Sequence, residues 1–473
     1  MTTPDQGEGS AERLVARNFA ALGAGEALAR LVAFAATVYV ARVLGPAPYG
    51  VVEVALAIIL YCSRIADFGI DAGLGVREIA ADPHRLRSLS SSVFLGRTAV
   101  SALVAGLLAI FGLGVLPAPE GPVLAIYGVS LLAIGLSTRW IHLGRERAVP
   151  VSVARLLGEV TMVALVLLFV RSADDLLRVP LAKVAGDLLA AAILYFWLRR
   201  DGVRVGAGWH WQRIRPLVPR AWSLVLSGLL GLMIFNADLL ALRIFRGAET
   251  VGYYAAAYSL VGFLTNLGIS FSTSLLPTLT RLRSTPEEQR SLYRNAHLQA
   301  FTVGLPIAIG GGFVASGIVG LVFGSAFAKS VLPLQILLWS APLGFARDVA
   351  TAGLVAAEEE HRVLRLTGWS TLLNVVLNLA LIPGFGMLGA AAATVMTESV
   401  RMALVCWLAA QRGLPVPGPQ ALLSPVLAGA FMAALLAWIE MPLFLAIGVG
   451  AVAFAACLAA TGGHRPLLAA RRI

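Results

Sequence analysis

Long apolar segments and short polar breaks alternate along the whole chain. Each apolar segment holds roughly twenty residues, the length that an α-helix needs to cross the hydrocarbon core of a bilayer. Breaks rich in Pro, Gly and charged residues separate fourteen such segments, at residues 18–41, 51–69, 91–115, 122–139, 151–170, 179–198, 217–242, 250–278, 297–323, 331–356, 366–384, 388–410, 421–439 and 441–461. The pattern predicts an all-α integral membrane protein with about fourteen transmembrane helices.

The composition agrees with lipid as the solvent of these segments. Of the 473 residues, 58% are hydrophobic and only 13% are charged, whereas soluble domains carry about 25% charged residues. The 48 glycines fit the same picture, because small residues let helix backbones approach one another closely in a bilayer. A water-soluble fold of this length is therefore excluded.

The basic residues predict how the helices are oriented. If the helices alternate in direction, 24 of the 37 Lys and Arg residues lie on the side of the N-terminus, six lie on the opposite side and seven lie within the apolar segments. Cytoplasmic loops carry the excess of Lys and Arg in membrane proteins. We therefore expect cytoplasmic tails at residues 1–17 and 462–473. Glu26 and Arg30 in the first apolar segment are unlike a signal peptide, so this segment is expected to remain as a helix.

The net charge of +11 does not indicate a nucleic-acid partner, because the arginines are scattered among the breaks and form no separate basic arm. The three cysteines lie inside apolar segments without paired spacing, and the six histidines form no HExxH-like cluster. Lys183 and Lys329 both follow Ala, so the Gly-Lys-[Ser/Thr] of a P-loop is absent. The sequence predicts no cofactor, no metal site and no enzymatic activity.

Two hairpins on the outer side resemble each other. Residues 42–52 and 243–254 each place Arg at the end of one helix, then a Gly turn, then Gly at the start of the next helix. They lie six helices apart, which is typical of transporters built from parallel repeats with the substrate bound between them. Gly-rich turns between helices are also common without any repeat. With the repeat we expect an N-lobe at 18–200, a basic cytoplasmic linker at 201–216, a C-lobe at 217–411 and two further helices at 420–461.

Four parts of the sequence resemble a known family. They are ARVLGPAPYG at 41–50; DFG at 67–69 with REIA at 77–80; Asp238 with VGYYA at 251–255; and NVVLN at 374–378 with IPGFG at 382–386 and GAA at 389–391. In order and spacing they resemble polysaccharide-export flippases of the multidrug/oligosaccharidyl-lipid/polysaccharide (MOP) exporter superfamily, over about residues 13–411.

The resemblance implies two pseudo-symmetric six-helix lobes around a central cavity, with two extra C-terminal helices. It implies transport by alternating access of an undecaprenyl-pyrophosphate-linked oligosaccharide, or a related glycolipid, across a bacterial inner membrane for cell-surface polysaccharide or O-antigen synthesis. The expected partners are this lipid-linked oligosaccharide, membrane lipids, and a polysaccharide polymerase and glycosyltransferases of the same pathway.

Charged residues inside the apolar segments are the candidate site. An ion at the bilayer centre costs roughly 2.5–3.5 kcal/mol on insertion scales, so it usually faces a cavity or a partner. Arg30 and Arg401 lie near mid-helix and Arg347 lies about two-thirds along its helix. Arg binds phosphate through two parallel hydrogen bonds, so these three are candidate ligands of a pyrophosphate. Arg97 lies near a helix end, from which it is expected to reach the headgroups.

Pairing within a helix is the alternative explanation of these charges. Glu26 and Arg30 are four residues apart and Glu398 and Arg401 are three apart, spacings that place both groups on one helix face. Arg347 adjoins Asp348. The carboxylates also suit proton or sodium binding, and Glu26, Asp238 and Glu398 are the ion-coupling candidates.

Neutral polar residues recur at helical spacing in the second half of the chain. Asn374 and Asn378 share one helix face, and Tyr258 lies on another with Tyr254. These side chains suit sugar hydroxyls and are candidate glycan ligands, although Ser and Asn also commonly link helices to one another in membranes.

Three other functions remain open from the sequence: a cation-coupled multidrug exporter, a lipid II flippase of the same superfamily, and a membrane glycan polymerase or ligase. The third usually needs a large outer loop, and the outer breaks here hold no more than about ten residues.

Overall fold

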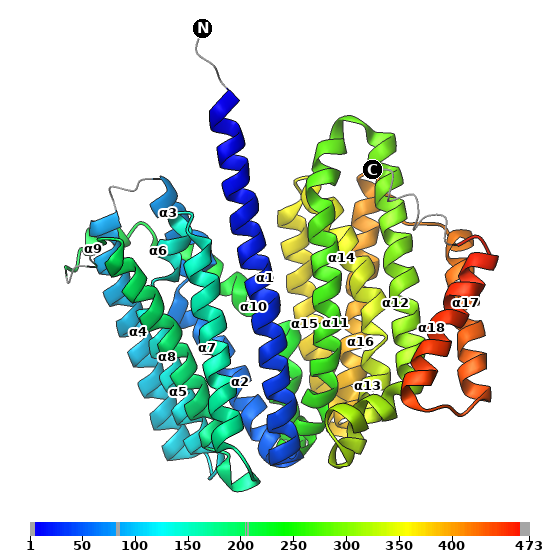
Figure 1. Cartoon of the computed structure of the whole chain (residues 1–473), viewed down its shortest axis with the longest axis horizontal. Coiled ribbons are helices and arrows are strands. Elements are labelled where there is room, and N and C mark those ends of the chain that lie inside the picture. Colours follow the sequence, from blue (N-terminus) through cyan, green and yellow to red (C-terminus); the bar gives the residue numbers. More distant parts are fainter. Residues whose placement is uncertain (1–4, 82–85, 204, 206–207, 464–473) are drawn as a thin grey trace. The chain divides into compact units, whose positions relative to one another are not determined.

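Helices make up all the regular secondary structure in the computed structural model, which describes residues 5–81, 86–203, 205 and 208–463 (Figure 1). Within these residues, twelve helices are long and apolar enough to cross a membrane, and two broken helix pairs raise the number to fourteen. The fourteen spans follow the fourteen predicted segments in order. The predicted fold class, an all-α multi-pass membrane protein, is confirmed.

The chain divides into two compact units, Met1–Leu232 and Met233–Ile473. The first unit contains α1 (Asp5–Leu44), α2 (Pro46–Asp67), α3 (Gly75–Ala81), α4 (Leu86–Val115), α5 (Glu120–Leu136), α6 (Arg139–Gly144), α7 (Ala148–Phe169), α8 (Arg178–Arg200), α9 (Trp211–Ile214) and the first part of α10 (Val218–Arg246). In this unit α4 packs on α5, α7 packs on α1 and α8, and α5 also contacts α2 and α8. Helix α1 begins at Asp5, before the expected residue 18, because good helix formers such as Ala, Glu, Arg and Leu precede the apolar segment.

The second unit contains the rest of α10, α11 (Ala248–Arg281), α12 (Pro286–Val322), α13 (Val331–Leu337), α14 (Ser340–Ala356), α15 (Glu360–Phe385), α16 (Met387–Gln411), α17 (Pro419–Trp438) and α18 (Leu443–Ala460). Helix α14 lies at its centre and contacts α11, α12 and α16, while α17 and α18 pack on each other and on α12. Helices α13 and α14 form one broken span with a 42° bend. The lobe and tail boundaries expected from the sequence stay predictions.

Glycines allow the closest helix contacts. A Cβ atom at Gly186 of α8 would lie 2.5 Å from the backbone oxygen of Gly158 in α7, and one at Gly121 of α5 would lie 2.2 Å from that of Gly112 in α4. Lipid supplies no hydrophobic force between helices, so close van der Waals packing of this kind holds them together.

Candidate functional site

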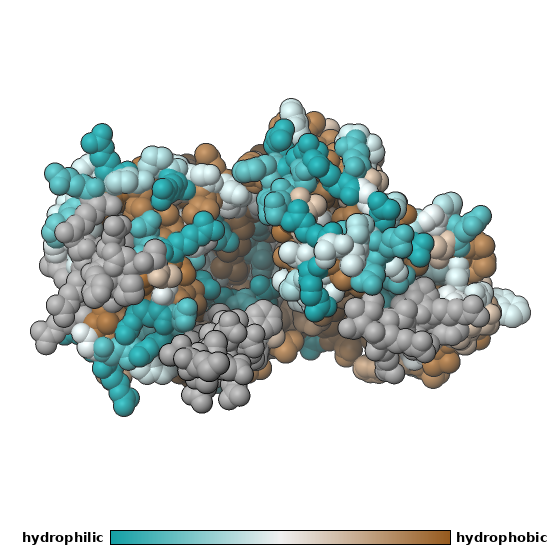
Figure 2. All heavy atoms as spheres, turned by 90° about the horizontal axis from the view of Figure 1, so that it is seen from above, coloured by the Kyte–Doolittle hydropathy of each residue, from teal (hydrophilic) through white to brown (hydrophobic). Residues whose placement is uncertain are grey.

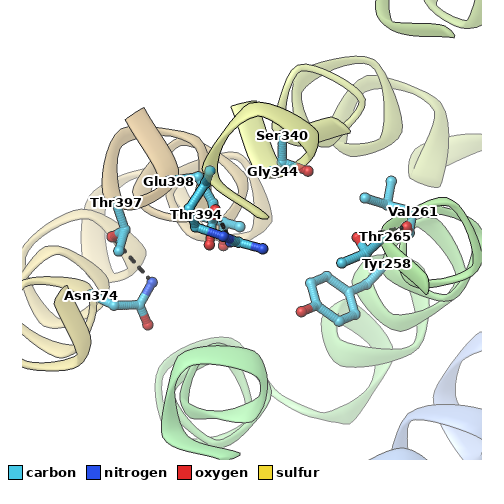
Figure 3. A pocket seen from close by; sticks show the side chains of 10 residues that line it. Tyr258, Val261, Thr265, Ser340, Gly344, Asn374, Thr394, Thr397 and Glu398 are labelled. Carbon is cyan, nitrogen blue, oxygen red and sulfur yellow. Dashed lines mark hydrogen bonds and ion pairs between the residues drawn. The ribbon is translucent and has the colours of Figure 1, made fainter. Parts of the chain in front are cut away.

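A polar cavity lies in the second unit among α11, α14, α15 and α16. Four of the predicted site residues, Tyr258, Arg347, Asn374 and Glu398, line it together with Val261, Thr265, Ser340, Gly344, Thr394 and Thr397. Figure 3 shows Tyr258 and Asn374 reaching into this space from different helices. The cavity measures about 30 Å³, and because a water molecule needs roughly 10–15 Å³ on this scale, the site accepts small groups but no sugar ring in this conformation.

Arg347 is the residue of this site whose side chain makes ionic hydrogen bonds to two carboxylates. Its Nη1 donates to Glu398, and its Nε and Nη2 donate to Asp348 Oδ1 at 3.1 and 2.7 Å. The residue is only 4% exposed. The bridge to Glu398 joins α14 to α16, which no spacing along one helix predicts. Because a buried charge without a partner is very unfavourable, the two carboxylates explain how the guanidinium is tolerated at this depth.

Arg401 brings a second cation to the same carboxylate. Its Nη1 lies 3.8 Å from Glu398 Oε1, and its Nη2 donates to Thr367 Oγ1 of α15 at 3.3 Å. Glu398 is therefore shared by two arginines on different helices. Together with Arg347 and Asp348, these residues form a cluster of two positive and two negative side chains. A proton or an anion that binds there changes the net charge of this cluster.

The two predicted asparagines form a hydrogen-bonded line along α15. Asn378 Nδ2 donates to Asn374 Oδ1 at 3.0 Å, and Asn374 Nδ2 donates to Thr397 Oγ1 of α16 at 3.3 Å, as the dashed line in Figure 3 marks. Both asparagines are buried, and the Oδ1 atom of Asn378 has no hydrogen-bond partner. Asn374 faces the cavity directly, whereas Asn378 reaches it through its neighbour.

Asp238 is connected to the cavity through tyrosines. The Tyr254 hydroxyl donates to Asp238 Oδ2 and lies 3.4 Å from the Thr394 hydroxyl. The ring of Tyr254 stacks on that of Tyr258 with centroids 5.9 Å apart. Asp238 itself is 1% exposed and also accepts a hydrogen bond from the backbone N–H of Leu239 at 2.8 Å. Asp238, Glu398 and Tyr258 thus belong to one continuous polar region.

The remaining candidates, Arg30 and Glu26, belong to the first unit. Arg30 Nε donates to Glu26 Oε1 at 2.8 Å, and Arg155 of α7 lies 2.9 Å from Glu26 Oε2. The side chain of Arg30 is 51% exposed. On α8, Lys183 pairs with Asp187 four residues later. This unit therefore carries its own group of ions on α1, α7 and α8, which is far less enclosed than that of the second unit.

Arg97 is a buried ion that the sequence reasoning placed wrongly. Its side chain does not extend outward but is 2% exposed, with Nη2 at 2.9 Å from Asp67 Oδ1 and 3.3 Å from Asp71 Oδ2. Helix α2 ends at Asp67 because Phe68 and Gly69 adopt positive φ angles of 51° and 72°. The following π-helical turn η1 (Ile70–Leu74) then turns Asp71 toward the same guanidinium. In the sequence, the signal for this site was the pair Asp67 and Asp71, which stand four residues apart on either side of the helix break.

Within the described part of the chain, no group of three or more His, Cys, Asp or Glu side chains is arranged to hold a metal ion. The site offers hydrogen-bonding and ionic groups only. It can bind a small cation or a proton at its carboxylates, or an anion at its arginines once a carboxylate releases them.

Several known proteins resemble this chain in sequence. "Probable low-salt glycan biosynthesis flippase Agl15" of Haloferax volcanii is 27% identical over 235 residues, which cover 47% of this chain and 49% of that protein. "Probable flippase AglR" of the same organism is 25% identical over 168 residues, covering 34% of this chain and 35% of that protein. The chain thus spans about half the length of the first of these relatives and about one third of the second.

Solved structures resemble the fold. The lipid II flippase MurJ in an inward closed conformation superposes with a TM-score of 0.78 at 13% identity, covering 94% of this chain and 99% of that chain. An inward-facing multidrug resistance MATE family transporter of the MOP superfamily reaches a TM-score of 0.64 at 15% identity, covering 81% and 94%. The fold is that of MurJ and the MATE transporters.

The family follows from the sequence itself. The family model described as "Polysaccharide biosynthesis protein" matches residues 15–283, which is more than half of the 473 residues. The match includes the first three of the four segments on which the resemblance to polysaccharide-export flippases was based. The chain therefore belongs to the polysaccharide biosynthesis protein family and has a MOP-superfamily fold.

Proposed function

We propose that this protein is a flippase. It moves an undecaprenyl-pyrophosphate-linked oligosaccharide, or a related glycolipid, from the inner to the outer leaflet of the bacterial cytoplasmic membrane for the synthesis of a cell-surface polysaccharide. The family membership, the two relatives named as probable flippases and the MurJ-like fold support this function. The observation that carries it is the enclosed ionic site around Arg347 inside apolar helices, since such residues usually mark a transport path.

In this proposal Arg347 and Arg401 are the phosphate ligands of the second unit. The hydrogen bonds of the Arg347 guanidinium go to carboxylates, so a phosphate oxygen has to replace Glu398 before it can bind Nη1. Protonation of Glu398 removes its negative charge and weakens that bridge. Proton uptake at Glu398 and pyrophosphate binding at Arg347 therefore favour one another. Asp238 is the second ion-coupling group in this unit, connected to the cavity through Tyr254.

Arg30 and Glu26 act in the same way in the first unit. Glu26 is shared by Arg30 and Arg155, as Glu398 is shared by Arg347 and Arg401. Each unit thus presents one carboxylate between two arginines from different positions of the fold. A doubly charged pyrophosphate needs such cations along its route, and Asn374, Asn378 and Tyr258 supply hydrogen-bonding groups for the glycan.

The orientation in the membrane completes the proposal. Both termini and the linker at 201–216 lie in the cytoplasm, as the distribution of arginine indicates. The glycolipid enters from that side with its headgroup in the polar site and its polyprenyl tail in lipid. The cavity of about 30 Å³ excludes a sugar ring, so transport requires a second, more open conformation, as alternating access demands.

A genetic experiment tests this function in the native cell. Deletion of the gene should abolish the surface polysaccharide while the lipid-linked oligosaccharide accumulates inside. The wild-type gene should restore it and Arg30→Ala should not, although the variant is still inserted in the membrane. Arg178→Ala is the matched control, because Arg178 begins α8, is half-exposed and contacts Asp175 and the carbonyl oxygen of Phe169, both within nine residues of it in the sequence.

The alternatives predict different phenotypes for the deletion strain. Normal surface polysaccharide together with a loss of resistance to organic cations would replace the proposal by multidrug export. Accumulation of lipid II with an intact surface polysaccharide would make the protein a lipid II flippase. A surface polysaccharide that is displayed normally by Arg30→Ala cells would remove Arg30 from the site.

A further inference from the structure

A second cavity lies in the first unit, and it is almost entirely apolar. It measures about 240 Å³ and is lined by Phe68, Ile70, Ser92, Val93, Gly96, Arg97, Val100, Trp209, Trp211, Ile214 and Val218. Apolar cavities of about 150 Å³ already accept benzene. This cavity therefore has room for a short length of hydrocarbon chain. Its one charged lining residue, Arg97, is already paired with Asp67 and Asp71.

The wall formed by the linker before α9 is fixed to α4. The Ser92 hydroxyl accepts a hydrogen bond from the backbone N–H of His210 at 2.8 Å and donates to the carbonyl oxygen of Gly208 at 3.2 Å. Ser92, Gly96 and Val100 are four residues apart, so they share the face of α4 that lines the cavity. The cavity is therefore built between a membrane-spanning helix and a segment that leaves the membrane.

Tryptophans mark the open side of this cavity. Trp209 and Trp211 stack with ring centroids 6.3 Å apart, yet they are 53% and 51% exposed. Tryptophan is enriched at the boundary between hydrocarbon and headgroups. In Figure 1, α9 lies with α3 and α6 at the same end of the first unit as the start of α1. These features place the mouth of the cavity at the headgroup level.

The sequence that forms this wall of the cavity is rich in arginine. Residues 199–220 contain six arginines and a single acidic residue, Asp201. Arg215 is exposed, and Arg220 is 72% exposed with Glu78 as a weak partner at 3.7 Å. Hydrophilic side chains cover much of this end of the molecule (Figure 2). Arginines near a membrane surface attract anionic lipids, at about 1 kcal/mol or roughly fivefold in affinity for each residue.

From this arrangement we propose that the protein binds an anionic glycerophospholipid here. Part of one acyl chain fills the cavity between α4 and α9, and the phosphate lies beside Arg215, which follows α9, and Arg220 in the first turn of α10. The proposal does not depend on the proposed transport function, because none of the residues assigned there to the glycolipid lines this cavity.

Native mass spectrometry of the delipidated full-length protein tests the site. The wild-type protein should retain one dioleoylphosphatidylglycerol at least tenfold more tightly than dioleoylphosphatidylcholine. Val100→Phe fills the cavity and should weaken phosphatidylglycerol at least tenfold, whereas Val160→Phe, at an exposed position of α7, should not. The double variant Arg215→Gln/Arg220→Gln should bind phosphatidylglycerol roughly 25-fold more weakly, at about fivefold for each arginine, and so lose the preference, and the control Arg178→Gln should keep it.

Photo-crosslinking of the wild-type protein gives a second test, which does not depend on the folding of any variant. Phosphatidylglycerol with a photoreactive group in its acyl chain should label peptides that contain residues 92–100 or 209–218. Labelling confined to other helices would overturn the proposal. Equal retention of both phospholipids, or unchanged binding by Val100→Phe, would also contradict it. Labelling of this cavity by a polyprenyl phosphate that phosphatidylglycerol does not displace would assign the site to the carrier lipid instead.

Discussion

Replacing Arg347 by Gln should destabilise the protein more than replacing its partner Glu398. Arg347 is 4% exposed, and its guanidinium donates hydrogen bonds to the carboxylates of Glu398 and Asp348. Breaking a buried ion pair by removing one partner costs about 3–5 kcal/mol, because the other charge stays buried without compensation. Arg347→Gln leaves Asp348 without its arginine and Glu398 with only the 3.8 Å contact to Arg401, so we expect a cost at the upper end of this range.

The reverse change leaves less charge unpaired. In Glu398→Gln, Arg347 keeps both of its hydrogen bonds to Asp348, and Arg401 loses a contact of 3.8 Å but keeps its hydrogen bond to Thr367. The expected cost therefore lies at the lower end, about 3 kcal/mol or less. The double variant Arg347→Gln/Glu398→Gln should be less destabilised than the sum of the single variants by at least about 2 kcal/mol, because contacting residues couple.

Unfolding of the detergent-solubilised variants by added dodecyl sulfate, followed by tryptophan fluorescence, gives the free energies for this double-mutant cycle. Each variant is first compared with the wild-type protein by size-exclusion chromatography, so that only folded protein enters the cycle. Additive costs within about 0.5 kcal/mol, or a larger loss for Glu398→Gln than for Arg347→Gln, would refute the described pairing.

Three further changes test other parts of the structure. Arg97→Gln should lower the free energy of unfolding by about 3–5 kcal/mol in the same assay, since two aspartates lose their buried cation; an unchanged value would mean that the ions are hydrated. Gly186→Ala should lower the free energy of unfolding by about 1–3 kcal/mol, because the added Cβ overpacks against α7. Gly106→Ala should not lower it, because nothing lies within 4 Å of the added Cβ. Equal effects of the two changes would contradict the close contact between α7 and α8. Arg30→Ala should change the free energy of unfolding by no more than about 1 kcal/mol, because its ion pair is half-exposed. A loss larger than that of the control Arg178→Ala in the same assay would mean that Arg30 has a structural role.

The transmembrane helices could be predicted from the sequence because their signal is local. A run of about twenty apolar residues specifies a span without knowledge of its neighbours, and the breaks fall where Pro, Gly and charged residues gather. The predicted segments 366–384 and 388–410, with only three residues between them, are two helices, α15 and α16, joined at Gly386 with a φ angle of 58°. The break between α13 and α14 was not foreseen, since both halves are apolar.

The ion pairs within one helix could also be foreseen. The spacing of Glu26 with Arg30 and of Glu398 with Arg401 placed each pair on one face, and the structure has both contacts. The pairs between helices could not be foreseen, among them Arg347 with Glu398. These depend on which helices are neighbours and on their relative height, and both are set by packing at small residues rather than by any local pattern.

The central claim, translocation of a lipid-linked oligosaccharide, is tested most directly with purified protein in liposomes. A fluorescent polyprenyl-pyrophosphate oligosaccharide is placed in both leaflets, and a lectin that cannot cross the membrane reports the sugar that becomes accessible outside. The account predicts that the wild-type protein exposes the inner pool, that Arg30→Ala does not, and that Arg178→Ala behaves as the wild type. If the inner pool stays protected with folded wild-type protein under every proton and sodium gradient tested, while an organic cation is transported, the account is contradicted.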